Sequence, residues 1–221
     1  MRLTMLVSPM KIPSISRPLL VALLAVTVLL AGTKPAIGQA FCALRDPHSS
    51  IAALYPTATS HRSIVRSLGE EERQLMREKY GHELRETELG RHTVYAVFRD
   101  ETPLGFVHVR SEKARFGMIE IAWAIDLDLR VTGLNLQRGH DLAARDLLDG
   151  PFPARMLGLD FGDLEIERGR GVDSEWMVEI PEDQLWFAEL LLEAAPRTLV
   201  ATVVGWGPEL VALRKLREDG P

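Results

Sequence analysis

The chain has 221 residues, of which 46% are hydrophobic and 26% are charged, and its formal net charge is −5 at pH 7. This length suits one domain with an adequate core, and the acidic balance argues against nucleic-acid binding, because neutralising phosphates requires a basic face. The single cysteine, Cys42, excludes an internal disulfide, a cysteine-rich metal site and a Cys-x-x-Cys-His haem attachment.

The first 40 residues have the pattern of a secretory signal. Three basic residues precede an apolar run over residues 19–31, which is short for a membrane-spanning helix, and Gly38-Gln39-Ala40 offers small residues for cleavage. We therefore expect a signal peptide at 1–40 and a domain at 41–221 that is exported to the periplasm or beyond. An uncleaved N-terminal membrane anchor is the alternative.

The N-terminal part of the expected domain is helical with one short strand. In chain order we predict a short helix over residues 46–55 that Pro56 ends, a strand over 63–67 and a charged helix over 68–80. The charged helix has acidic residues early and basic residues late, which complements the helix dipole, and Gly81 is expected to end it.

The middle of the chain is rich in strand signals. The predicted segments are strands over 93–98, 104–110, 117–125 and 129–136, turns at 100–103 and 126–128, and a polar loop over 111–115. Each connection is too short for a crossover helix. The simplest arrangement is therefore an antiparallel meander.

Helical signals dominate the C-terminal third. We predict short helices over 141–148 and 152–159, an acidic, Gly-rich loop over 160–172, a helix over 181–195 opened by Pro181, a segment over 197–204 compatible with either strand or helix, and a terminal helix over 209–217. The fold class is therefore α+β, a single domain in which helices pack an antiparallel meander. The helix over 181–195 is expected to bury Leu185, Trp186, Leu190 and Leu191.

Several short motifs between residues 46 and 140 follow one another in a recognisable order. They are Leu54-Tyr55-Pro56-Thr57-Ala58, the charged helix ending at Gly81, the tyrosine-bearing strand over 93–98, Gly105-Phe106-Val107, and the segment 117–133, which ends in an acid-x-acid-x-x-Val-x-Gly turn. This order resembles the FMN-binding domain family, which includes flavin-bearing subunits of Rnf-type and sodium-pumping NADH:quinone reductase complexes. The resemblance implies an exported electron-transfer protein, rather than a stand-alone enzyme, whose partners are membrane-bound or periplasmic redox proteins.

The family's flavinylation motif is missing from this chain. Covalently flavinylated members carry Ser/Thr-Gly-Ala-Ser/Thr, whose last threonine is joined to the FMN phosphate. The nearest segment in place is 194–198, which lacks the glycine and contains Pro196, so Thr198 is at most a remnant attachment site. FMN, where bound, is thus expected to be non-covalent. The alternatives are a non-enzymatic binding or assembly module that keeps the fold without flavin, and a small-molecule sensor.

Five residues are candidates for contacting such a flavin. Arg110, Lys113 and Arg115 are predicted to share one loop, and basic side chains suit phosphate oxygens. Phe116 and Trp123 offer rings that stack on an isoalloxazine. The competing interpretations are a solvated hairpin end for the three cations and a place in the core for the two aromatic residues.

Other kinds of site find little support in the sequence. The six histidines are scattered without a His-x-x-x-His or His-Glu-x-x-His spacing, and a Gly-x-Ser-x-Gly elbow is absent. Asp126 and Asp128 could point the same way, as a calcium site or an acid–base pair requires, but a hairpin turn uses the same residues. The sequence therefore predicts neither a metal site nor a hydrolase.

Overall fold

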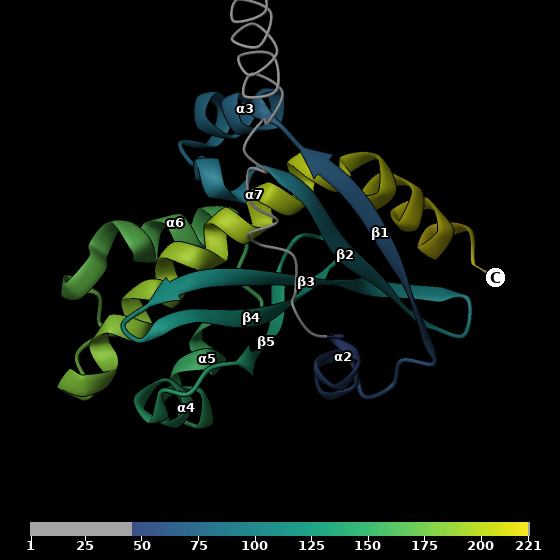
Figure 1. Cartoon of the computed structure of the whole chain (residues 1–221). Coiled ribbons are helices and arrows are strands. Elements are labelled where there is room, and N and C mark those ends of the chain that lie inside the picture. The colour runs from purple at the N-terminus through teal and green to yellow at the C-terminus, as the bar shows by residue number, and fades with distance from the viewer. Residues whose placement is uncertain (1–45, 221) are drawn as a thin grey trace, which may run out of the picture. The chain divides into compact units, whose positions relative to one another are not determined.

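A computed structural model describes residues 46–220 of the chain (Figure 1). The predicted signal peptide, its cleavage site and Cys42 lie outside the described residues. Within 46–220, no helix combines the length and the apolar character needed to cross a membrane.

A five-stranded antiparallel sheet forms the centre of the described fold. Its strands are β1 (Ser60–Leu68), β2 (Gly90–Arg99), β3 (Thr102–Ala114), β4 (Gly117–Asp126) and β5 (Val131–Arg138). They lie in the order β1-β2-β3-β4-β5, and each strand pairs with its neighbour in the chain. The predicted α+β fold with an antiparallel meander is confirmed.

Strand β3 is longer than the sequence predicts. The residues expected to form a polar loop over 111–115 continue the strand, with Ser111 opposite Glu120 and Ala114 opposite Gly117. The loop prediction was wrong because it rested on the polar character of these residues, and polar side chains here continue a buried strand. The carboxylate of Glu112 is 1% exposed and meets cations from distant parts of the chain, so the turn shrinks to Arg115 and Phe116.

Two helices and a short turn precede β2 in the chain. Helix α2 (His48–Leu54) packs on one face, where Ile51 joins the apolar side chains of Val107 and Val109. Helix α3 (Glu70–Tyr80) follows β1 and ends at Gly81, whose left-handed φ of 70° confirms the predicted stop. The turn η1 (Glu86–Glu88) then leads into β2.

Four helices and one short turn follow the sheet. They are α4 (Leu142–Asp149), α5 (Phe152–Met156), α6 (Phe161–Arg170), η2 (Gly171–Asp173) and α7 (Glu182–Asp219). Helix α6 contradicts the predicted loop over 160–172. Its N-terminus is capped by reciprocal hydrogen bonds between Asp160 and Asp163, and Glu165 pairs with Arg168 one turn later. These local side-chain contacts outweigh the low helix propensity of the glycines.

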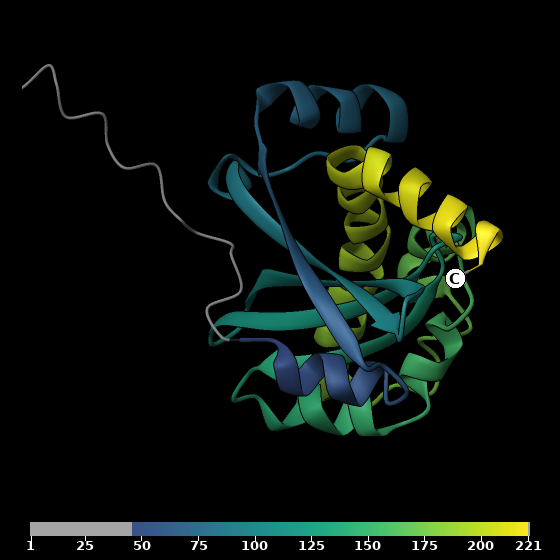
Figure 2. The same cartoon turned by 90° about the vertical axis from the view of Figure 1, so that its right-hand side faces the viewer.

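Helix α7 runs along the face of the sheet opposite α2 (Figures 1 and 2). It includes the ambiguous segment 197–204 and the predicted terminal helix, with one kink at Trp206, where φ is −130° and ψ is 24°. Pro208 explains the kink, because its ring lacks an N–H and crowds the carbonyl one turn earlier. Burial of Leu191 is confirmed. The other side chains expected in its core face, Leu185, Trp186 and Leu190, are only partly buried.

Two apolar clusters separate the sheet from the helices on the α7 side. One gathers Trp123, Phe152 and Phe187 around the first half of α7, and the other gathers Phe106 and Trp206 around the second half. Between them, the middle of β3 presents polar side chains to α7.

Candidate functional site

Three successive inward positions of β3 are polar. Side chains alternate along a strand, so His108, Arg110 and Glu112 share the face toward α7 while Val107 and Val109 point to the α2 side. All three polar side chains are buried, at 0%, 3% and 1% exposure. Burying charge in this way is costly unless each group is paired, so the partners of these side chains define the site.

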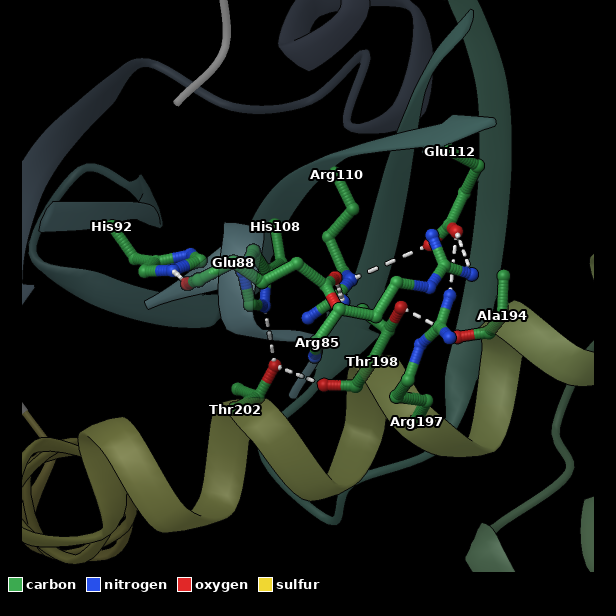
Figure 3. Close-up of polar contacts among 10 residues, drawn as sticks. All are labelled: Arg85, Glu88, His92, His108, Arg110, Glu112, Ala194, Arg197, Thr198 and Thr202. Carbon is green, nitrogen blue, oxygen red and sulfur yellow. Dashed lines mark hydrogen bonds and ion pairs between the residues drawn. The ribbon is translucent and has the colours of Figure 1, made fainter. Parts of the chain in front are cut away.

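Arg110 is held between two carboxylates (Figure 3). Its Nη2 pairs with Oε1 of Glu88, which comes from η1, and its Nε lies 3.7 Å from Oε1 of Glu112. The other carboxylate oxygen of Glu88 accepts a hydrogen bond from the backbone N–H of Arg85 at 2.8 Å. The short turn η1 therefore fixes the position of Glu88.

Glu112 connects the strand to α7. Its Oε2 accepts a hydrogen bond from Nη2 of Arg197 at 2.5 Å and lies 3.4 Å from Nη2 of Arg85. The result is a buried ion-pair network of two carboxylates and three guanidinium groups, made by Arg85, Glu88, Arg110, Glu112 and Arg197. It ties η1, β3 and α7 together.

The pKa shifts follow from burial and from these pairings. Burial alone would raise the pKa of Glu88, but the charges of Arg110 and Arg197 and the Arg85 N–H together lower it below its usual value. Burial lowers the pKa of Arg110, against the opposing effect of Glu88 and Glu112. For Arg197, the contacts to Glu112 outweigh burial and raise its pKa. The pairings therefore favour the ionised forms of Glu88 and Arg197, and at Arg110 they oppose the effect of burial on its pKa.

Two neutral imidazoles lie beside the network. Nδ1 of His108 is 2.9 Å from Oγ1 of Thr202, whose hydroxyl donates to the carbonyl of Thr198 at 2.8 Å. The hydroxyl proton is therefore engaged, which assigns the His108 proton to Nδ1. Burial, and then the charge of Arg110, lowers the pKa of His108 well below its usual value. His92 contacts the Glu88 carbonyl, and burial likewise lowers its pKa.

Not every polar atom of the site is satisfied by the described part of the chain. Nε and Nη1 of Arg110, Nε of Arg197, Oε1 of Glu112 and Nε2 of His108 are buried without a hydrogen-bond partner among the residues in 46–220. The ion pairs and hydrogen bonds of this site join protein groups to one another, and the side chains of Glu88, Arg110 and Glu112 have almost no contact with solvent, whereas Arg85 lies at the surface. The arrangement is suited to fixing α7 on β3.

The predicted flavin contacts fall into two separate places. Arg110 belongs to the buried network, and Trp123 is 0% exposed in the core opposite His108. Lys113, Arg115 and Phe116 instead come together at the exposed tip of the β3–β4 hairpin, where Phe116 is 86% exposed. The five side chains therefore do not gather around one flavin ring and its phosphate.

Thr198 does not offer an accessible attachment point. It lies within α7, is 1% exposed and donates its hydroxyl to the carbonyl of Ala194 at 2.6 Å. The candidate residues in the interior thus do not fit a flavin, because the hydroxyl, the guanidinium and the indole that it would contact are enclosed by protein.

Asp126 and Asp128, the acidic pair at the end of β4, belong to a turn. Oδ1 of Asp126 accepts hydrogen bonds from the backbone N–H groups of Asp128 and Arg130, at 2.9 and 2.8 Å, and Asp128 pairs with Arg217. Over the described residues, no group of three or more His, Cys, Asp or Glu side chains is placed to hold a metal ion. The turn interpretation of Asp126 and Asp128 agrees with this geometry.

Sequence reasoning missed Glu88, Glu112 and Arg197. One available signal was the alternation of polar and apolar residues along β3, with His108, Arg110 and Glu112 at every second position. Alternation alone does not reveal which side of a strand is buried. Comparison with protein-family models, with curated proteins and with solved structures found no match to this chain.

Proposed function

We propose that this chain is a non-enzymatic binding or assembly module of an exported system, in which a buried ion-pair network takes the place of a flavin site. The observation that carries the proposal is that Arg110 is buried and paired with two carboxylates. This side chain, expected to contact a flavin phosphate, is 3% exposed and lies between Glu88 and Glu112. A phosphate could reach it only by displacing those carboxylates and moving α7.

The same geometry disfavours acid–base catalysis at this site. A general acid or base must come within hydrogen-bond reach of its substrate. His108 and Glu88 are 0% and 2% exposed, and both are enclosed by the sheet, η1 and α7. Their shifted pKa values are explained by burial and by structural pairing, which perturb pKa values without any catalytic role.

The rival proposal is an electron-transfer protein that holds FMN non-covalently and passes electrons to membrane-bound or periplasmic redox proteins. It rests on the resemblance in residues 46–140 and on the exposed tip. There, Lys113 and Arg115 offer cations for a phosphate, and Phe116 offers an aromatic face.

A visible spectrum of the full chain, expressed with its own N-terminus and purified, separates the two proposals. We expect a colourless protein that takes up no added FMN. Flavin bands that remain in the pellet after acid precipitation would indicate covalent attachment. Bands released into the supernatant would support the rival. In that case the double variant Lys113→Ala, Arg115→Ala should weaken FMN binding, whereas Lys79→Ala, on α3, is a matched control.

A further inference from the structure

We propose that the end of the molecule where α7 begins is a self-association surface, through which two copies of this chain form a two-fold dimer. In this dimer the β3–β4 tip of each copy lies in an acidic depression of the other. The surface is separate from the buried ion-pair network, and the inference does not depend on whether flavin binds.

The β3–β4 tip is a basic and apolar projection. Residues 113–118 contain Lys113 and Arg115 and lack any acidic residue. Phe116 and Met118 are 86% and 39% exposed. The guanidinium of Arg115 lies 5.3 Å from the ring centroid of Trp186, which fixes its direction. An exposed aromatic ring beside an arginine is typical of the residues that anchor protein–protein interfaces.

The acidic depression has complementary properties. Its volume is about 440 Å³, and it is lined by Arg155, Glu175, Trp176, Val178 and Glu179. Val178 is 79% exposed. Trp176 packs edge-to-face against the buried ring of Phe152, with ring centroids 6.2 Å apart. The depression therefore combines an apolar floor, which a phenyl ring would cover, with an acidic rim.

The surrounding charge strengthens this match. Residues 173–183 include the exposed acids Asp173, Glu175, Glu179, Glu182 and Asp183 and no Lys or Arg. Arg155 pairs with Glu179 at 2.8 Å and offsets one of these charges, so the segment keeps a net negative charge from its other four acids. Opposite charges across an interface guide association and fix its register. A second copy of the chain brings the required cations on its own tip.

Tip and depression lie at the same end of one molecule. Arg115 contacts Trp186 in the second turn of α7, and the acidic segment leads directly into the first turn of that helix. Figure 1 shows the β3–β4 tip and the start of α7 at the same, left-hand end of the described fold. Two complementary patches on one face allow a two-fold arrangement, in which both contacts form at once and the assembly closes at two copies.

Sedimentation equilibrium of the full chain over a concentration series tests the dimer. The mass should rise from monomer toward dimer as the concentration approaches about 100 μM, and Phe116→Ser should weaken the association by about tenfold or more. The double variants Lys113→Glu, Arg115→Glu and Glu175→Lys, Glu179→Lys should each be monomeric. An equimolar mixture of these two variants should recover the association, because opposite charges then meet at both contacts: the unchanged tip of one variant faces the unchanged depression of the other, and the two altered patches face each other.

Two controls keep the result interpretable. Glu179 also pairs with Arg155, so the single variant Glu175→Lys tests the rim without breaking that pair. All the changed side chains are exposed, so the thermal midpoint should stay close to that of the unchanged chain. A wild-type chain that remains monomeric, or a dimer that all these substitutions leave intact, would overturn the proposal. If the chain stayed monomeric and bound to anionic phospholipid vesicles, the tip would be a membrane-binding surface and the dimer proposal would be wrong.

Discussion

Arg110 and Arg115 show how one residue type takes different roles within the same hairpin, because Arg110 lies in the buried middle of β3 and Arg115 in the exposed turn that follows it. A basic side chain beside Lys113 and Arg115 in the sequence suggests a common anion site, yet strand alternation and the hairpin tip separate them. Arg110 points inward to Glu88 and Glu112, whereas Lys113 and Arg115 are exposed. Burial decides the role here, because an enclosed guanidinium requires fixed carboxylates.

Gly105 is required by a close approach of two strands and a side chain. A Cβ at this position would lie 2.3 Å from the carbonyl oxygen of Ile125 and 2.5 Å from the hydroxyl of Tyr55. That hydroxyl donates to the same carbonyl at 3.0 Å, and burial is the main cause that raises the pKa of Tyr55 to about 12, so it stays protonated.

We therefore predict that Gly105→Ala lowers the free energy of unfolding by about 1–3 kcal/mol or more, because overpacked atoms must move apart. Urea denaturation measures this change. Gly169→Ala is the matched control: nothing lies within 4 Å of a Cβ there, and the residue is inside α6. The control should be neutral or slightly stabilising. Equal stability of the two variants would contradict the packing argument.

His108 should make the stability of the fold sensitive to acid. Burial lowers its pKa in the folded state, so between that value and the usual 6.5 only the unfolded chain takes up the proton. The free energy of unfolding therefore falls as the pH drops below about 6.5, with a slope near 1.4 kcal/mol per pH unit for one such group. The lowered pKa of Glu88 adds a loss in the same direction at lower pH.

His108→Gln should reduce this pH dependence, because a glutamine amide can still donate to Thr202 but does not take up the proton. Urea denaturation of both proteins between pH 7 and pH 5 gives the two slopes. The exposed His140→Gln is the matched control. Parallel curves for the wild-type chain and His108→Gln would show that the buried imidazole is not the acid-sensitive group.

At the scale of elements, the kink in α7 divides the helix into two parts with different neighbours. Trp206 stands at the kink with 0% exposure. Its indole N–H donates to the carbonyl of Ile64 in β1 at 3.1 Å, and its ring meets the edge of His108 with centroids 5.3 Å apart. The segment beyond the kink is thereby attached to the edge of the sheet.

Trp206→Ala should cost about 3–5 kcal/mol of stability, because it leaves a large cavity and removes a hydrogen bond. It should also expose the segment 208–219 to proteolysis and to amide hydrogen exchange before the rest of the fold opens. Val211→Ala, at a position 64% exposed, is the control and should change little. If protection of 208–219 survived the loss of Trp206, another contact would have to hold that segment.

The sequence predicts those elements whose signals are local. Strand alternation and short connections are enough to predict the meander, and Gly81 correctly marks the end of α3. The segment 197–204 was ambiguous because its Thr and Val residues favour strand. In the structure, Thr198 and Thr202 donate to carbonyls four residues earlier, and burial against the sheet outweighs their intrinsic preference.

The candidate site was harder to predict because its partners are distant in sequence. Glu112 meets Arg197, 85 residues later, and Arg110 meets Glu88, 22 residues earlier. Neither pairing leaves a local pattern, so Arg110 was grouped with its neighbours in the chain. Once β3 is placed beneath α7, the need to neutralise buried charge makes both pairings necessary.

At the scale of the whole described fold, the network joins two apolar clusters. Apolar contacts tolerate small shifts of a helix along a sheet, whereas ion pairs with fixed geometry do not. Glu112 and Arg197 are thus placed to set one register of α7 on β3. Removing one partner leaves an uncompensated buried charge, which typically costs about 3–5 kcal/mol.

The most direct test of the central claim is the free energy of unfolding of the wild-type full chain and of Arg110→Met, each measured with and without excess FMN. We predict that Arg110→Met loses about 3–5 kcal/mol and that FMN changes neither protein, because a ligand stabilises only a fold that binds it. Arg85→Met, at a side chain 45% exposed, is the control and should lose much less. FMN-dependent stabilisation of the wild-type chain that disappears in Arg110→Met, with little change in the absence of FMN, would contradict the structural role of Arg110.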